Sequence, residues 1–144
     1  MSSFTDPQIE CRVLLCGRNF ELLQPFTFYT RHTPPEGTQL PEHAGGQFYD
    51  IVVHAGLITD FASTPRLTWS LLPPIGKFSK AAVVHDYLYI RQIGDRAWAD
   101  RVFLEAMHVS RVNIINRYLY YWGVRAFGWW AWRKWRKVKE AAND

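Results

Sequence analysis

The stretch that decides the fold is Lys80–Met107, which reads KAAVVHDYLYIRQIGDRAWADRVFLEAM. Apolar residues recur at helical spacing on both sides of Gly94, and glycine commonly ends a helix. We therefore predict two helices, Lys80–Gln92 and Arg96–Ser110, joined by a short turn. Helices joined so closely run antiparallel, so this stretch predicts a helix hairpin.

Signals on either side extend the helical part of the chain. Ser79 and Asp95 precede the two helices and belong to the residue types that cap helix N-termini. A third helix is predicted from near Asn113 to about Ala141. The C-terminal half of the chain is thus expected to be helical.

The N-terminal half carries β-branched and aromatic runs interrupted by Gly and Pro, a pattern typical of short strands. Residues 33–47 are rich in proline and glycine and predict a long loop. We expect a small antiparallel sheet with strands at Arg12–Leu15, Phe20–Leu23, Phe26–Arg31 and Phe48–His54, and a short continuation at Leu57–Thr59. A β-rich half followed by helices predicts an α+β fold. With 144 residues we expect one domain, made of a β-rich part (1–64), the helix hairpin (79–110) and a C-terminal helix (113–141).

The formal net charge of +4 is unevenly distributed. Residues 1–110 hold 9 Lys and Arg against 11 Asp and Glu, and residues 111–144 hold 8 against 2, so the charge divides into −2 and +6. Five of the seven tryptophans also lie in the basic tail. Residues 113–141 could pack against the chain's own core or a partner subunit, and the partners we expect for them are a membrane surface or other virion proteins, with an oligomer possible. The aromatic residues are too clustered and apolar for a nucleic-acid groove.

Two features bear on localisation. The N-terminal sequence MSSFTDPQIE lacks a basic region followed by an apolar core, so we expect no signal peptide. The longest apolar stretch, Tyr118–Trp132, is shorter than the ~20 residues of a membrane span and contains Arg125, so we expect no transmembrane helix.

The predicted hairpin places two candidate catalytic residues, His85 and Asp100, at the same distance from its turn. His85 lies seven or eight residues before the turn and Asp100 the same distance after it, so both are about 11 Å from the turn. Tyr89 is four residues after His85 and projects from nearly the same side. A carboxylate on one imidazole nitrogen would orient His85 as a general base, with Tyr89 holding Asp100. A purely structural polar network would use the same three residues.

Two further carboxylates are candidate metal ligands. Asp86 lies beside His85 and could hold a hard cation such as calcium next to the base. Asp60 follows a predicted strand, where it could cap a turn or point into the site as a metal ligand or an acid.

A wider pattern surrounds these residues. It comprises Gly56-x-x-Thr59-Asp60-Phe61-Ala62-Ser63-x-Pro65-Arg66, Trp69, Pro73-Pro74 and Gly76, then Ala81-Ala82, His85-Asp86-Tyr87-Leu88-Tyr89, Arg96, Ala99-Asp100-x-x-Phe103 and Met107, and finally Val124-Arg125-x-Phe127-Gly128. It resembles the bacteriophage and prophage family known as domain of unknown function 1353, over most of residues 45–130. The resemblance implies a phage or prophage source, and thus a virion or infected-cell location. It implies no established chemistry.

A second resemblance concerns the hairpin alone, about 25 residues. His85-Asp86-x-x-Tyr89 followed by Asp100 is similar to the core of secreted-type phospholipases that cut the sn-2 ester, above all the disulfide-free version of parvovirus capsids. The resemblance implies that His85 activates water, Asp86 binds calcium, and Asp100 with Tyr89 orients His85. The glycine-rich calcium loop of those lipases has no counterpart before His85. Either Asp60 and its loop supply the missing ligands or no calcium binds.

These observations leave three functional hypotheses. The first is a phage-encoded, calcium-assisted, phospholipase-like hydrolase that acts at a membrane. The second is a non-catalytic virion or tail-assembly protein whose aromatic C-terminal helix docks on partner subunits. The third is a hydrolase of the cell wall or another metal-dependent hydrolase.

Overall fold

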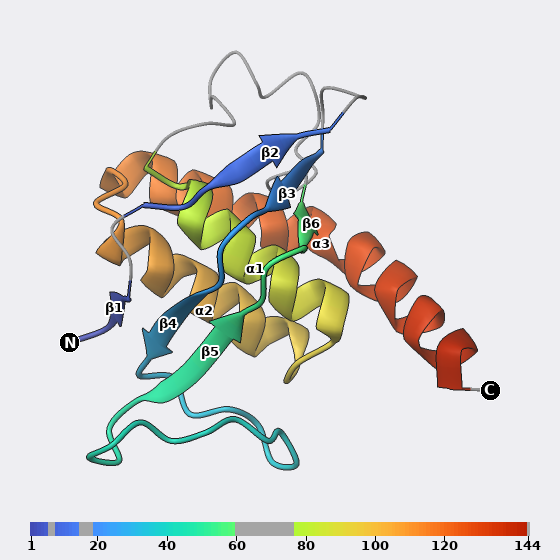
Figure 1. Cartoon of the computed structure of the whole chain (residues 1–144), viewed down its shortest axis with the longest axis horizontal. Helices are drawn as coiled ribbons and strands as arrows, with labels where there is room; N and C mark the ends of the chain where they lie inside the picture. The colour runs from blue at the N-terminus through green and yellow to red at the C-terminus, as the bar shows by residue number, and fades with distance from the viewer. Residues whose placement is uncertain (6–7, 15–18, 60–76, 144) are drawn as a thin grey trace.

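The N-terminal half forms two small antiparallel sheets in the computed structural model, which describes residues 1–5, 8–14, 19–59 and 77–143 (Figure 1). One sheet has the order β1-β4-β5 and the other β2-β3-β6. The strands are β1 Ser3–Phe4, β2 Cys11–Val13, β3 Phe20–Leu22, β4 Phe26–Thr30, β5 Tyr49–Val53 and β6 Ile58–Thr59. The α+β prediction is therefore confirmed, with the strands divided between two sheets.

Side-chain alternation explains why β4 and β5 pair as they do. Phe26, Phe28 and Thr30 of β4 are buried while the residues between them are half-buried. In the register of the pair, Phe28 lies opposite Ile51 and Phe26 opposite Val53, so one face of the pair is apolar. This face turns toward the helices.

Three helices follow: α1 Ser79–Arg91, α2 Arg96–Val109 and α3 Ile114–Asn143. α1 and α2 form the predicted hairpin, with β5 against α1 and β4 against α2. α3 packs against both helices of the hairpin and its C-terminal turns extend beyond them (Figure 1). Within the described ranges, no helix combines the length and the apolar character needed to cross a bilayer.

The helix ends test the predicted caps. Asp95 caps α2, since its carboxylate accepts a hydrogen bond of 2.7 Å from the amide of Trp98. The prediction for Ser79 is wrong, because the amide of Ala82 donates to the carbonyl of Phe78, which makes Phe78 the N-cap and Ser79 the first helical residue. Asn113 caps α3 through a 2.8 Å bond from the amide of Asn116.

Glu105 of α2 fastens the first sheet to the helices. Its carboxylate accepts hydrogen bonds from the hydroxyls of Ser2 and Thr30. It also accepts a 3.2 Å bond from the amide of Arg31. The side chain of Glu105 is only 9% exposed, so these donors replace the water that it loses on burial.

Candidate functional site

His85 and Asp100 meet between α1 and α2, as their equal distance from the turn predicts. Nε2 of His85 lies 2.9 Å from Oδ1 of Asp100. The hydroxyl of Tyr89 donates a 2.7 Å hydrogen bond to the same oxygen. The three predicted catalytic residues thus form one cluster, in which His85 is 3% exposed, Tyr89 4% and Asp100 fully buried.

Two arginines complete the surroundings of Asp100, and sequence reasoning missed both. Nη1 of Arg125, from α3, donates a 2.9 Å hydrogen bond to Oδ2 of Asp100. Nη1 of Arg96 lies 3.6 Å from the same oxygen and donates to the carbonyls of Val124 and Arg125. Two signals pointed to them: Arg96 is four residues before Asp100 on one helix, and Arg125 is the charge that interrupts an apolar stretch.

These contacts decide the ionisation of Asp100. Burial raises the pKa of this carboxyl, but the hydrogen bond from His85, followed by those from Tyr89 and Arg125, outweighs burial and leaves the pKa below its ordinary value. Burial and the neighbouring Asp100 charge raise the pKa of Tyr89, which therefore stays a hydrogen-bond donor. Hydrogen bonding to Asp100 raises the pKa of Arg125.

The ionised Asp100 fixes which nitrogen of His85 carries the hydrogen that the two residues share. A carboxylate can only accept hydrogen bonds, so Nε2 of His85 must carry the hydrogen that joins the two residues. In the neutral imidazole the other nitrogen, Nδ1, then has a free lone pair. Nδ1 is buried and has no hydrogen-bond partner among the described residues. Buried polar atoms usually have partners, so this nitrogen is the feature of the cluster that requires an explanation.

Aromatic rings hold the imidazole in place. The centroid of the His85 ring lies 4.2 Å from that of Tyr89 and 4.6 Å from that of Phe103. The Tyr89 ring meets Trp132 of α3 edge-on at 5.0 Å. Gly128 lets α3 approach at this point, because a Cβ there would lie 2.7 Å from the Tyr89 hydroxyl oxygen. The cluster is therefore fixed by packing as well as by hydrogen bonds.

Of the two predicted metal ligands, only Asp86 lies among the residues that the structure describes. Asp86 is half-buried, and its carboxylate accepts a hydrogen bond from the hydroxyl of Thr59 at the end of β6. Asp60 lies outside the described residues. Among the residues that are described, no group of three or more His, Cys, Asp or Glu side chains could hold a metal ion. A calcium site would therefore need Asp60 or its neighbours in addition to Asp86.

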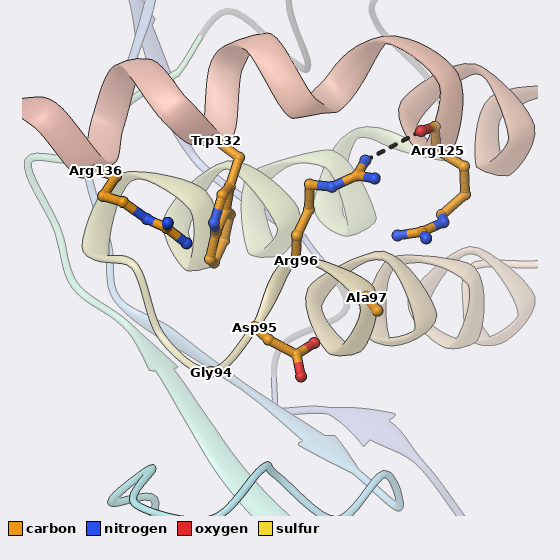
Figure 2. A pocket seen from close by; sticks show the side chains of 7 residues that line it. All are labelled: Gly94, Asp95, Arg96, Ala97, Arg125, Trp132 and Arg136. Carbon is orange, nitrogen blue, oxygen red and sulfur yellow. Dashed lines mark hydrogen bonds between the residues drawn. The ribbon is translucent and has the colours of Figure 1, made fainter.

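A pocket of about 420 Å³ opens next to the cluster, between the α1–α2 turn and α3 (Figure 2). It is lined by Gly94, Asp95, Arg96, Ala97, Arg125, Trp132 and Arg136. Figure 2 shows the Arg96 guanidinium reaching across it to the backbone oxygen of Arg125, with Trp132 beside Arg136. His85 and Asp100 are not among the lining residues, so the pocket lies on the arginine side of the cluster.

Comparison with known families agrees with the sequence pattern. Residues 41–124 match the family described as "Protein of unknown function (DUF1353)". The chain belongs to this family. No match was found among curated proteins or among solved structures. The matched segment contains β5, β6, both helices of the hairpin and the start of α3, so it includes His85, Tyr89 and Asp100 and ends one residue before Arg125.

Proposed function

We propose that the protein is a hydrolase in which His85 acts as a general base on water. The observation that carries this proposal is the asymmetry of the imidazole. Nε2 is held by Asp100 at 2.9 Å, while Nδ1 is buried and unpartnered among the described residues. General-base catalysis requires a histidine that is anchored through one nitrogen while the other can reach water, and in this proposal water enters the cluster to meet Nδ1.

The proposed reaction uses each member of the cluster. Nδ1 of His85 takes a proton from a water molecule, whose oxygen attacks the carbonyl carbon of an ester. The ionised Asp100 stabilises the positive imidazolium that results, and Tyr89 holds the Asp100 carboxylate in place. When the ester bond breaks, the imidazolium returns its proton to the leaving alkoxide. One ester and one water become a carboxylic acid and an alcohol.

The proposals for the substrate and the cofactor come from the resemblance of the hairpin sequence to phospholipases. The proposed substrate is taken from the resemblance of the hairpin sequence to the secreted-type and parvoviral phospholipases, in which the substrate is the ester of a phospholipid. We propose the same substrate class here. Asp86 and Asp60 would hold calcium, which would polarise the ester carbonyl when bound. We also infer a phage or prophage source, and action in the virion or the infected cell, from the sequence pattern around the hairpin.

The test is hydrolysis of a fluorogenic phospholipid by the purified chain, with calcium or with a chelator. We expect wild-type activity in calcium and a loss of about 10²–10⁴-fold in His85→Ala. The chain offers a matched control in His43, whose Nδ1 lies 3.1 Å from Asp50 outside the cluster. His43→Ala should keep full activity. A wild-type protein that leaves phospholipid and simple carboxylic esters intact in calcium would exclude the proposal.

One observation favours a second candidate, a non-catalytic virion or assembly protein. Asp100 receives side chains from all three helices and is fully buried, with each carboxylate oxygen contacted by two groups. Such a cluster also suits a structural joint between helices. If purified phage particles contain the chain in fixed stoichiometry and His85→Ala leaves them infective, this candidate replaces the hydrolase.

A further inference from the structure

α3 carries an apolar surface that the rest of the described chain does not cover. Five large side chains along one side of α3, between residues 115 and 130, are 48–77% exposed, and we call them the outer face of α3. They are Ile115, Leu119, Trp122, Trp129 and Trp130. Monomeric proteins rarely expose contiguous apolar patches of this kind unless something binds there.

The outer face is continuous along the helix. Ile115, Leu119, Trp122 and Trp129 follow one another at intervals of four, three and seven residues, which places them on one side. The opposite side of α3 is also apolar, because Tyr120 and Trp132 are buried against the hairpin. A helix that is apolar on both sides is ordinarily covered on both, so the outer face requires an occupant.

The net charge of α3 indicates what kind of partner could cover its outer face. α3 contains seven Lys and Arg and a single acidic residue, Glu140, which gives a net charge of +6. The exposed Arg133 and Lys134 lie above the rings of Trp129 and Trp130, at 5.7 and 5.8 Å from the ring centroids. Cationic groups that extend past tryptophan rings are typical of helices at the boundary between lipid and water.

We propose that the outer face of α3 lies on the surface of a bilayer that contains anionic lipid. The aromatic and aliphatic side chains would enter the headgroup region, and the basic residues would meet lipid phosphates. A second copy of the chain fits less well, because pairing two outer faces would bring two helices of charge +6 together. This inference rests on α3 alone and stands whether or not His85 is catalytic.

The test is co-sedimentation of the full chain with vesicles of ether-linked lipids, which no esterase can cleave. One set contains phosphatidylcholine only, and the other contains equal parts of phosphatidylcholine and phosphatidylglycerol. We expect binding to the anionic set and loss of that binding in high salt. His85→Ala should bind as the wild type does, which separates this inference from the proposed function.

Variants define the surface. The triple variant Trp122→Ser, Trp129→Ser and Trp130→Ser should lower the partition coefficient by about tenfold or more, and so should Arg133→Gln with Lys134→Gln. The matched control is Val13→Ser with Ile58→Ser, which removes two residues that are 59% and 52% exposed but lie in β2 and β6. This control should bind normally.

Two results would overturn the inference. One is a wild-type protein that stays in the supernatant with anionic vesicles. The other is binding that the tryptophan and charge variants leave unchanged. If the wild type ignores vesicles and forms a dimer that the tryptophan variant dissociates, the outer face is an interface between copies of the chain instead.

Discussion

Replacing Gly128 with alanine should destabilise the protein, although alanine is the better helix former. Elsewhere in a helix this substitution adds about 0.5–1 kcal/mol of stability. At Gly128 the new Cβ would lie 2.7 Å from the hydroxyl oxygen of Tyr89, far inside contact distance. Tyr89 cannot turn aside easily, because its ring is 4% exposed and packs against His85 and Trp132.

The loss of stability depends on whether Tyr89 or α3 moves to relieve the clash. If the Tyr89 hydroxyl moves, it loses its 2.7 Å hydrogen bond to the ionised Asp100, a type of bond that contributes about 1.5–3 kcal/mol. If α3 moves instead, overpacking costs about 1–3 kcal/mol. After the gain in helix propensity, we expect Gly128→Ala to lower the free energy of unfolding by about 1 kcal/mol.

Gly123 provides the internal control. It lies in the same helix, and a Cβ there would meet no atom within 4 Å. Gly123→Ala should therefore raise the free energy of unfolding by about 0.5–1 kcal/mol. In equilibrium urea denaturation, the midpoints of the two variants should differ by roughly 1 M.

A double-mutant cycle identifies the clashing atom. Tyr89→Phe removes the hydroxyl and leaves ring carbons 3.5 Å from the new Cβ, an ordinary contact distance. In the Tyr89→Phe background, Gly128→Ala should become neutral or stabilising. The reasoning is wrong if Gly128→Ala stabilises the otherwise unchanged protein as much as Gly123→Ala does.

Two further predictions concern charges at the hairpin. Asp100→Asn should lower the free energy of unfolding at neutral pH by about 3 kcal/mol, because it leaves Arg125 and His85 without their buried partner. Since the folded-state pKa of Asp100 lies below its unfolded value, its stabilisation is present above about pH 4 and is lost as the pH falls through the folded-state pKa. Urea denaturation over a pH series should therefore show a weaker acid dependence in the variant, and an unchanged slope would contradict the assignment. Asp95→Ala should cost about 1 kcal/mol through loss of the cap on Trp98; thermal unfolding that matches the wild type would show that the cap contributes nothing.

Local spacing explains which parts of the site could be predicted. His85, Tyr89 and Asp100 lie within 16 residues, and the turn at Gly94 determines how two rigid helices face each other. Arg125 could not be placed in this way, because its contact with Asp100 depends on how α3 docks across the hairpin. Helix docking is decided by the packing of side chains, which spacing along one helix does not reveal.

The same distinction applies to the sheets. The sequences of β4 and β5 predict strands, because they contain apolar residues at alternating positions. β1 is two residues long and owes its place to pairing with β4, so its own sequence carries too little pattern to predict it. The chain passes between the two sheets three times, after β1, β3 and β5. At the second crossing, between β3 and β4, Pro25 lacks the amide that a continuing ladder would use.

Glu105 and Asp100 lie five residues apart on α2, yet they join parts of the chain that lie at very different separations. The His85 and Arg125 contacts of Asp100 span 15 and 25 residues, whereas the Thr30 and Ser2 contacts of Glu105 span 75 and 103. Closing the longest of these loops costs about 1.7 kcal/mol more chain entropy than closing the shortest. We therefore expect the helical half to assemble around Asp100 first and the first sheet to join it afterwards through Glu105. α2 would then be the surface on which the first sheet completes its folding.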